Sequence, residues 1–430
     1  MFLFSPIPLT TVTEKKGKKL FCHLQHFGWI TLVVMTILIC CKPLQAQIIS
    51  TPDYEVLTAP DLWYNDVDGV RVGFRLRGQQ PGSFLDGPHR VDFGLWLGTK
   101  IPDYPLSYYL KYVEPIHAIT DYGSEGSFNV FSSIREGLHN HGVGLEKRWQ
   151  PGFNEFDFTE ASGYVSTHYR FEDEYTHYPI LWQSNVVTRF LSRFERQKEN
   201  KLGYYNFTSS LALGLPFDTD FFTQLNTAFE QELMISSNFS LNGRIFLTSS
   251  TDYLPTEYYH QTALAPALDW TLSGFTRSRG TIPNSWMDNG YIHIAGGPNL
   301  RGYTEQNIDA IMDDQPLLFS NFGALNLELQ YPNPVNDLLR NIPMLGDFLN
   351  FNSYLFFDTG APFDYDEGFD QTYSDAGAGF LLSMNIPDYV GRQRGFVFRY
   401  DIPFWLSDPA SGNDALKFRH LVSIGAVIGL

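Results

Sequence analysis

The stretch V-R-V-G-F-R-L-R, from Val70 to Arg77, alternates apolar and mostly basic side chains. Successive side chains of a β-strand point to opposite sides, so its valines, phenylalanine and leucine share one face and its arginines the other. An amphipathic helix would instead repeat its apolar residues every three or four positions. The stretch therefore predicts a strand with one apolar and one charged face.

The same alternation recurs along the chain, over the ranges 91–98, 239–247, 376–386 and 396–405. It is expected to continue to the terminus, with one face made of Phe418, Val422, Ile424, Ala426, Ile428 and Leu430. These stretches have about 9–11 residues, the length of a transmembrane β-strand. Strands of soluble proteins have about 5–6 residues. The segment between Gly126 and Arg170 shows the pattern least clearly.

Composition separates a membrane barrel from a soluble sheet protein. The chain is 16% aromatic, with 36 Phe and 24 Tyr, yet its mean hydropathy is −0.19. Lipid-facing residues that alternate with polar lumen residues give this combination. A secreted β-sandwich or propeller is the alternative, but here the second face carries Arg, Asp, Glu and Gly, as a lumen does. We expect an all-β fold, a transmembrane antiparallel β-barrel of roughly fourteen to sixteen strands that closes on itself in the bacterial outer membrane.

Residues 1–46 are expected to be a signal peptide, and residues 47–430 the barrel domain. The first segment has a basic start and a 13-residue apolar run from Trp29 to Cys41, and Ala46 is the expected cleavage position. A membrane-spanning helix needs about 20 residues, so a short transmembrane anchor is the weaker interpretation. All three cysteines lie in this segment, at Cys22, Cys40 and Cys41. No disulfide is therefore expected in the barrel.

Charge argues against a nucleic-acid partner. The first 46 residues hold five Lys and one Glu, a charge of +4, so the remainder carries −17 − 4 = −21. Such a surface repels phosphate. Outer-membrane lipid is the expected environment instead.

Three motifs share one part of the sequence. The weakly alternating segment from Ser250 to Leu317 is predicted to be a long loop, and it contains L-R-G-Y, Leu300, Arg301, Gly302 and Tyr303. Two strands follow, L-N-L-E-L-Q-Y-P-N-P (325–334) and Y-L-F-F-D-T-G (354–360). Alternation places Glu328 and Asp358 on the inward faces of these strands. The Arg301 guanidinium can pair with both if the loop folds into the lumen.

These motifs resemble those of the BamA-like superfamily of outer-membrane assembly and two-partner-secretion barrels, the bacterial surface antigen family. The resemblance implies a 16-stranded barrel whose long extracellular loop tucks into the lumen, with Arg301 contacting Glu328 and Asp358. It also implies help with insertion or translocation of polypeptide, or lipid, at the outer membrane, and a client polypeptide as partner. Two features depart from the family. The span from Gln47 to Asp66 leaves no room for POTRA domains, and Leu430 is not aromatic.

Two other functions stay open on the sequence. The chain can be a passive porin-like channel, in which the loop only narrows the lumen. It can also be a membrane anchor or export partner for a separately encoded periplasmic or secreted protein.

Candidate chemical sites receive weaker support. Asp358–Ala361 reads D-T-G-A, as in aspartic proteases, but those enzymes need two such aspartates and one copy is present. His139 and His141 can share one face of a strand, but no third metal ligand is evident. Asp66–Gly69 fits a turn better than a calcium loop, because the terminal Glu is missing. We expect no enzyme activity, catalytic residue, metal or cofactor.

Overall fold

The computed structural model describes residues 49–427 apart from short gaps at 52–53, 81–88, 101–104, 153, 155, 184, 218, 237–238, 274–275, 341, 343–348, 365–367, 370 and 388–392. The predicted signal peptide, residues 1–46, lies outside the described residues, as do Ile428 and Leu430 of the expected last strand.

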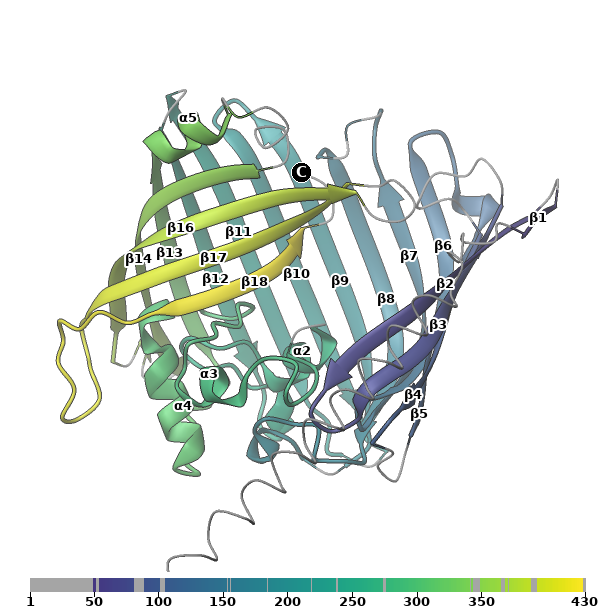
Figure 1. Ribbon diagram of the computed structural model, residues 1–430, viewed down its shortest axis with the longest axis horizontal. Coiled ribbons are helices and arrows are strands. Elements are labelled where there is room, and N and C mark those ends of the chain that lie inside the picture. The colour runs from purple at the N-terminus through teal and green to yellow at the C-terminus, as the bar shows by residue number, and fades with distance from the viewer. Residues whose placement is uncertain are drawn as a thin grey trace, which may run out of the picture.

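One antiparallel sheet curls into a barrel, which confirms the predicted fold class (Figure 1). Two of its strands are short, β1 (Ile49–Thr51) and β15 (Gly368–Phe369), and the other 16 are long. The long strands are β2 (Tyr54–Asn65), β3 (Gly69–Gln79), β4 (Arg90–Gly98), β5 (Leu106–Pro115), β6 (Ser124–Arg135), β7 (Leu138–Trp149), β8 (Phe158–Arg170), β9 (Val187–Asn200), β10 (Gly203–Leu215), β11 (Thr223–Ser236), β12 (Phe239–Ser250), β13 (Phe322–Tyr331), β14 (Leu349–Asp364), β16 (Tyr373–Pro387), β17 (Gln393–Leu406) and β18 (Leu421–Val427).

The longest connection, residues 251–321 between β12 and β13, folds into one end of the barrel, the lower end in Figure 1. We call it the plug loop. Outer-membrane barrels have short periplasmic turns and longer extracellular loops, so this is the extracellular end. Short helices give the plug loop a structure of its own, namely η3 (Thr256–Tyr258), α2 (Ala267–Leu272), α3 (Asn284–Asp288), η4 (Arg301–Tyr303) and α4 (Thr304–Met312). Helix α5 (Pro334–Arg340) follows β13 at the other end.

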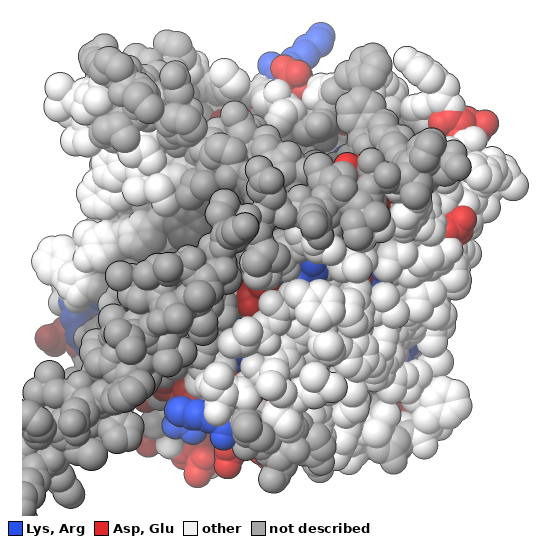
Figure 2. Space-filling model, turned by 45° about the vertical axis from the view of Figure 1, so that its right-hand side comes forward, with Lys and Arg blue, Asp and Glu red and all other residues white. Residues whose placement is uncertain are grey.

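The two faces of the wall differ as the alternation predicts. Large apolar side chains on the outer face are exposed, among them Val72, Leu97, Ile245 and Leu355 at 49–57%. Figure 2 shows uncharged residues over most of the described part of one side, with Lys, Arg, Asp and Glu mostly towards its upper and lower edges. Water does not favour so many exposed apolar side chains, whereas hydrocarbon does.

The hydrophobic core lies inside the barrel, between the plug loop and the inner face of the wall. Loop residues such as Leu264 and Leu300 are fully buried there, and wall residues such as Phe246 and Phe322 complete the same cluster. The loop thus supplies much of the apolar filling of the extracellular half of the lumen. The plug loop therefore packs as part of the folded barrel.

Paired residues join each strand to its neighbour from β2 to β18. Within the described ranges, no such register links β18 back to β2, and Figure 1 shows both at the front with β9 and β10 visible between them. Strand β2 is not evident in the sequence, because Pro60 and Asp61 interrupt its alternation. Proline is tolerated in such a position because β2 ends the ladder.

The prediction for the last strand is wrong in one respect. Phe418 was expected on its apolar face, but the strand begins at Leu421 and Phe418 lies in the preceding connection with 72% of its surface exposed. The segment 407–420 connects β17 to β18 at the extracellular end of the barrel (Figure 1). Alternation alone does not distinguish the strand from the turn residues before it.

No helix among the described residues is long and apolar enough to cross a membrane. The strands have the length, the apolar outer face and the paired backbone that a bilayer requires of a spanning wall. Barrels of this kind belong to outer membranes. The chain is therefore an outer-membrane β-barrel protein.

A charge on the outer face tests this orientation. Ile245, near the middle of β12 and 57% exposed, faces outward, whereas Asn242 lines a cavity inside the barrel. We expect Ile245→Arg to lower the free energy of unfolding from lipid by about 2–4 kcal/mol, the cost of arginine at the bilayer midplane. Asn242→Arg is the control and should change it by less than about 1 kcal/mol, since its side chain meets water. Equal effects in denaturant titrations of the two variants in vesicles contradict the assignment of faces.

Candidate functional site

The L-R-G-Y segment lies at the inner turn of the plug loop. Arg301 begins the short helix η4, and Thr304 Oγ1 donates to the Arg301 carbonyl oxygen at 2.9 Å, which closes the turn before α4. Leu300 and Tyr303 are at most 1% exposed and belong to the core inside the barrel. The turn thus presents the Arg301 side chain to the wall while its apolar neighbours fill the space around it.

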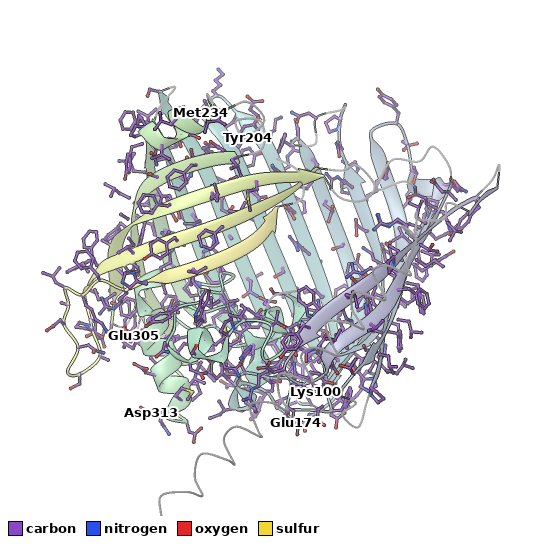
Figure 3. All side chains as sticks on the ribbon, viewed as in Figure 1. Lys100, Glu174, Tyr204, Met234, Glu305 and Asp313 are labelled. Atoms are coloured by element: carbon purple, nitrogen blue, oxygen red, sulfur yellow. The ribbon has the colours of Figure 1, made fainter. Side chains whose placement is uncertain are left out.

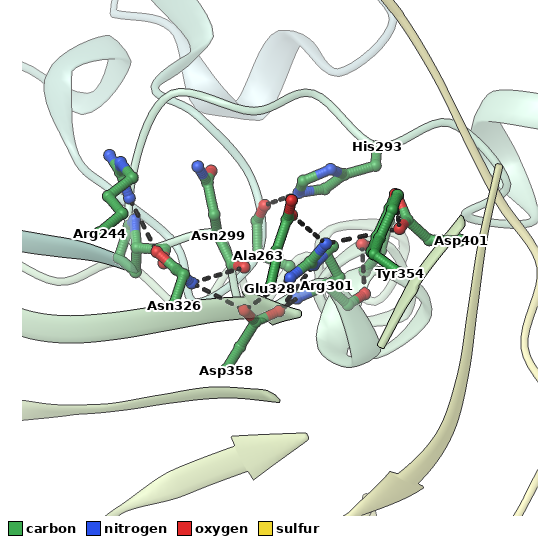
Figure 4. Close-up of polar contacts among 12 residues, drawn as sticks. Arg244, Ala263, His293, Asn299, Arg301, Asn326, Glu328, Tyr354, Asp358 and Asp401 are labelled. Carbon is green, nitrogen blue, oxygen red and sulfur yellow. Dashed lines mark hydrogen bonds and ion pairs between the residues drawn. The ribbon is translucent and has the colours of Figure 1, made fainter. Parts of the chain in front are cut away.

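Arg301 makes a two-pronged contact with Asp358 of β14. Its Nε donates to Oδ2 at 2.7 Å and its Nη2 to Oδ1 at 2.8 Å (Figure 4). Nη1 donates to Glu328 Oε1 of β13 at 2.7 Å. The guanidinium carbon lies 3.8 Å from the centre of the Phe356 ring. The structure therefore brings together the three residues that the sequence singles out.

The site extends to β17, which the sequence analysis did not assign to it. Arg301 Nη1 lies 3.4 Å from Asp401 Oδ1, which also accepts a hydrogen bond from the Tyr354 hydroxyl at 2.5 Å. Arg399 Nη2 donates to Glu328 Oε1 at 2.5 Å. We call Arg301 with Glu328, Asp358 and Asp401 the clasp. Alternation along β17 points both Arg399 and Asp401 into the barrel, but alternation alone does not give a distance across strands.

Asn326 ties the loop backbone to the clasp. Its Nδ2 lies within hydrogen-bond distance of the carbonyl oxygens of Pro298 and Asn299, at 3.1 and 3.2 Å. The same amide donates to Asp358 Oδ1 at 3.1 Å, while its Oδ1 accepts from Arg244 Nη1 at 3.0 Å (Figure 4). Asn326 stands opposite Asp358 in the β13–β14 ladder, which brings the two side chains together.

Gly302 and Tyr303 extend the contact to β16 and β17. A Cβ atom at Gly302 would lie 2.4 Å from Leu406 Cδ2 and 2.8 Å from Asp375 Cβ, so no larger residue fits without displacing the loop. The Tyr303 hydroxyl donates to the Ser374 carbonyl oxygen at 3.2 Å. The four residues of L-R-G-Y thus have separate roles: two fill the core, one allows close approach and one carries the charge.

Three carboxylates of the wall face the single guanidinium of Arg301 within the clasp. Asp358, Asp375 and Asp401 are fully buried, and the Arg301 side chain is 4% exposed. Burial lowers the pKa of the Arg301 guanidinium, but Asp358 and Glu328 outweigh it and hold that pKa well above its usual value. Arg301 therefore stays charged, and its removal takes from Asp358 the guanidinium that binds both its oxygens, whereas Glu328 keeps its contact with Arg399.

The other half of the plug loop contacts the opposite wall. His168 Nε2 of β8 lies 3.1 Å from Glu257 Oε1 in η3, and both side chains are at most 4% exposed. Arg170 Nη2 donates to Thr271 Oγ1 at 3.2 Å. Gln224 Nε2 of β11 donates to the Tyr258 carbonyl oxygen at 2.9 Å. The loop therefore reaches across the lumen, anchored on β8–β11 by one half and on β13–β18 by the other.

A cavity of about 420 Å³ borders the clasp inside the barrel. Its walls include charged and amide side chains together with Tyr204. Figure 3 shows Tyr204 and Met234 near the upper end of the barrel, while Lys100, Glu174, Glu305 and Asp313 lie towards the end that holds the plug loop. The cavity therefore runs from the clasp towards the periplasmic end.

The other candidates from the sequence fall in distinct places. Asp358 of D-T-G-A is a member of the clasp. His139 and His141 are neighbours on β7, with ring centres 5.7 Å apart, and no group of three or more metal-binding side chains occurs in the described part of the chain. Asp66–Asp68 forms the β2–β3 turn, where Asn65 Oδ1 accepts from two backbone N–H groups.

No protein-family model matches the sequence, and no curated protein matches it. Solved structures with a similar arrangement include BamA from Haemophilus ducreyi lacking POTRA domains 1–3, at 13% identity and a TM-score of 0.46, which covers 88% of this chain and 71% of that one. CdiB from Escherichia coli has 13% identity and a TM-score of 0.40, and covers 88% and 63%. The outer membrane protein opdK from Pseudomonas aeruginosa has 10% identity and a TM-score of 0.32, and covers 81% and 87%. At these scores the likenesses carry no conclusion about function.

Replacing Arg301 tests the clasp. We expect Arg301→Ala to destabilise the docked plug loop by about 3–5 kcal/mol, because it leaves the buried Asp358 carboxylate without its guanidinium partner. Protease added from outside should then cut within 251–321 much faster than in the wild type. Arg193→Ala is a matched control, since its ion pair with Glu195 is at 2.8 Å but its side chain is 54% exposed. Equal cleavage rates in the wild type and Arg301→Ala contradict the role of the clasp.

Proposed function

We propose that this barrel helps polypeptide, or lipid, to insert into or cross the outer membrane. The observation that supports it is the plug loop, which fills the extracellular half of the lumen and is bound through a buried ionic clasp. A buried ion pair contributes little more to the free energy of folding than apolar packing would, but removing one partner of the pair strongly destabilises the fold. Such a contact is suited to an element with two discrete arrangements, docked and released.

The clasp lies next to the last strands of the ladder, which also supports the proposal. Asp358 is on β14 and Asp401 on β17, and the loop reaches Val422 of β18 as well. Within the described residues, the β17–β18 ladder pairs seven residues of each strand, from Gly395 with Val427 to Asp401 with Leu421. A short ladder at the end of a sheet opens more easily than a long one. Release of the loop is therefore expected to loosen the β17–β18 end of the wall, where a client strand or a lipid can enter.

A passive porin-like channel is the second candidate. The cavity of about 420 Å³ beside the clasp favours it, because polar side chains line the route towards the periplasmic end. In that function the plug loop only narrows the lumen, and its release changes conductance without any effect on other polypeptides.

Reconstitution distinguishes the two. Purified protein in vesicles should speed the insertion of an unfolded outer-membrane polypeptide, and Arg301→Ala should change that rate because it undocks the loop. Conductance across planar bilayers is measured on the same preparations, with Arg193→Ala as control. Steady conductance in the wild type without any gain in the insertion rate overturns the proposal and supports the channel.

A further inference from the structure

The edge of β18 that faces away from β17 carries a piece of the plug loop. Ile292 forms a parallel bridge with Val422 of β18. The His293 N–H donates to the Val422 carbonyl oxygen at 3.0 Å, and the Val422 N–H donates to the Tyr291 carbonyl oxygen at 2.7 Å. Residues 291–293 thus behave as a short additional strand, which we call the edge segment.

The backbone N–H and carbonyl groups of Val422, which bond to the edge segment, point away from β17. Leu421 and Ser423 pair with β17, opposite Asp401 and Arg399. Backbone groups of successive residues in a strand point to opposite edges, so those of Val422 point outward from the sheet. The edge segment therefore occupies the first such position of β18, where another strand would have to begin pairing.

Side-chain contacts fix the edge segment in place. His293 Nε2 lies 3.0 Å from the Ala263 carbonyl oxygen, and His293 Nδ1 lies 3.4 Å from Ser423 Oγ. Burial lowers the pKa of the His293 ring to about 4, so the ring is neutral at pH 7 and can donate from Nε2 and accept at Nδ1. Ile292 is 6% exposed and packs in the same core as Leu300.

The edge segment and the clasp belong to one stretch of the plug loop. Thr262 and Ala263 join them, since the Leu300 N–H beside Arg301 donates to the Thr262 carbonyl oxygen at 2.9 Å and His293 Nε2 lies 3.0 Å from the Ala263 carbonyl oxygen. When Arg301 separates from the carboxylates of the clasp, the edge segment on β18 is therefore displaced with it. An exposed strand edge is a template for pairing with another chain, and proteins commonly cover such edges.

We propose that the edge segment is a removable cover for β18, which prevents another β-strand from pairing at Val422 while Arg301 is clasped and uncovers that edge when the clasp opens. The occupant after release is an extended strand of a polypeptide, which adds to the sheet edge through main-chain hydrogen bonds. The identity of that strand as a client rests on the proposed function. The covering itself does not.

Amide hydrogen exchange on the purified protein in detergent micelles tests the covering. In the wild type, the amides of His293 and Val422 should both be protected. In Arg301→Ala both should exchange at least about tenfold faster, because the two backbone hydrogen bonds between the edge segment and Val422 are lost together. The Ser423 amide faces β17 and is the internal control, which should not change. Unchanged exchange at His293 and Val422, or equal acceleration at Ser423, overturns the proposal.

A second variant keeps the clasp intact. His293→Pro removes the N–H that donates to Val422 and leaves Arg301 in place. A photo-crosslinker at Ser423, with a synthetic peptide of residues 54–65 as the strand probe, reports pairing at the uncovered edge. We expect crosslinking to rise at least about fivefold over the wild type, and His293→Ala, which keeps the N–H, to give a smaller rise. Equal crosslinking in the wild type and His293→Pro overturns the covering role. Because no client is present, failure of the insertion assay does not affect this result.

Discussion

The arrangement of this barrel depends on one guanidinium group, that of Arg301, placed among carboxylates on three strands of the wall. Asp358 is bound by two hydrogen bonds, and Glu328 and Asp401 complete the clasp. The Arg301–Asp358 contact is buried, so geometry and charge balance determine its strength. Around it the L-R-G-Y turn packs into the core, and the plug loop takes up its position across the lumen.

The energetics of such a contact explain its use in a movable element. Taking these charges out of water is costly, so the intact clasp adds only a modest net stabilisation, whereas an incomplete one is strongly unfavourable. The half of the loop that carries the clasp is consequently either docked or released. Its other half is anchored on β8 through His168 and Glu257, so release at the clasp leaves the loop attached to the opposite wall. The edge segment on β18 belongs to the half that moves.

Much of the fold follows from alternation, because a membrane wall imposes it on every spanning strand. The residues of β3, β4 and β17 show it directly, whereas β2 does not, since Pro60 interrupts the pattern at an edge that tolerates it. The phase of the strands placed Glu328 and Asp358 inward, and the L-R-G-Y motif supplied their partner. Alternation within 396–405 also puts Asp401 on the inner face, but its distance from Arg301 depends on how the wall curves, which no local pattern records. Residues 291–293 pair with β18 through backbone hydrogen bonds, so the pattern of side chains in the sequence does not predict this contact.

A double-mutant cycle measures the central interaction most directly. The free energies of unfolding of the wild type, Arg301→Met, Asp358→Asn and the double variant are compared in vesicles. The account predicts a coupling energy of at least about 1.5 kcal/mol between the two side chains, because each single change leaves the other charge buried and unbalanced. A coupling below about 0.5 kcal/mol contradicts it, since the two residues then act independently and the loop is held by other contacts.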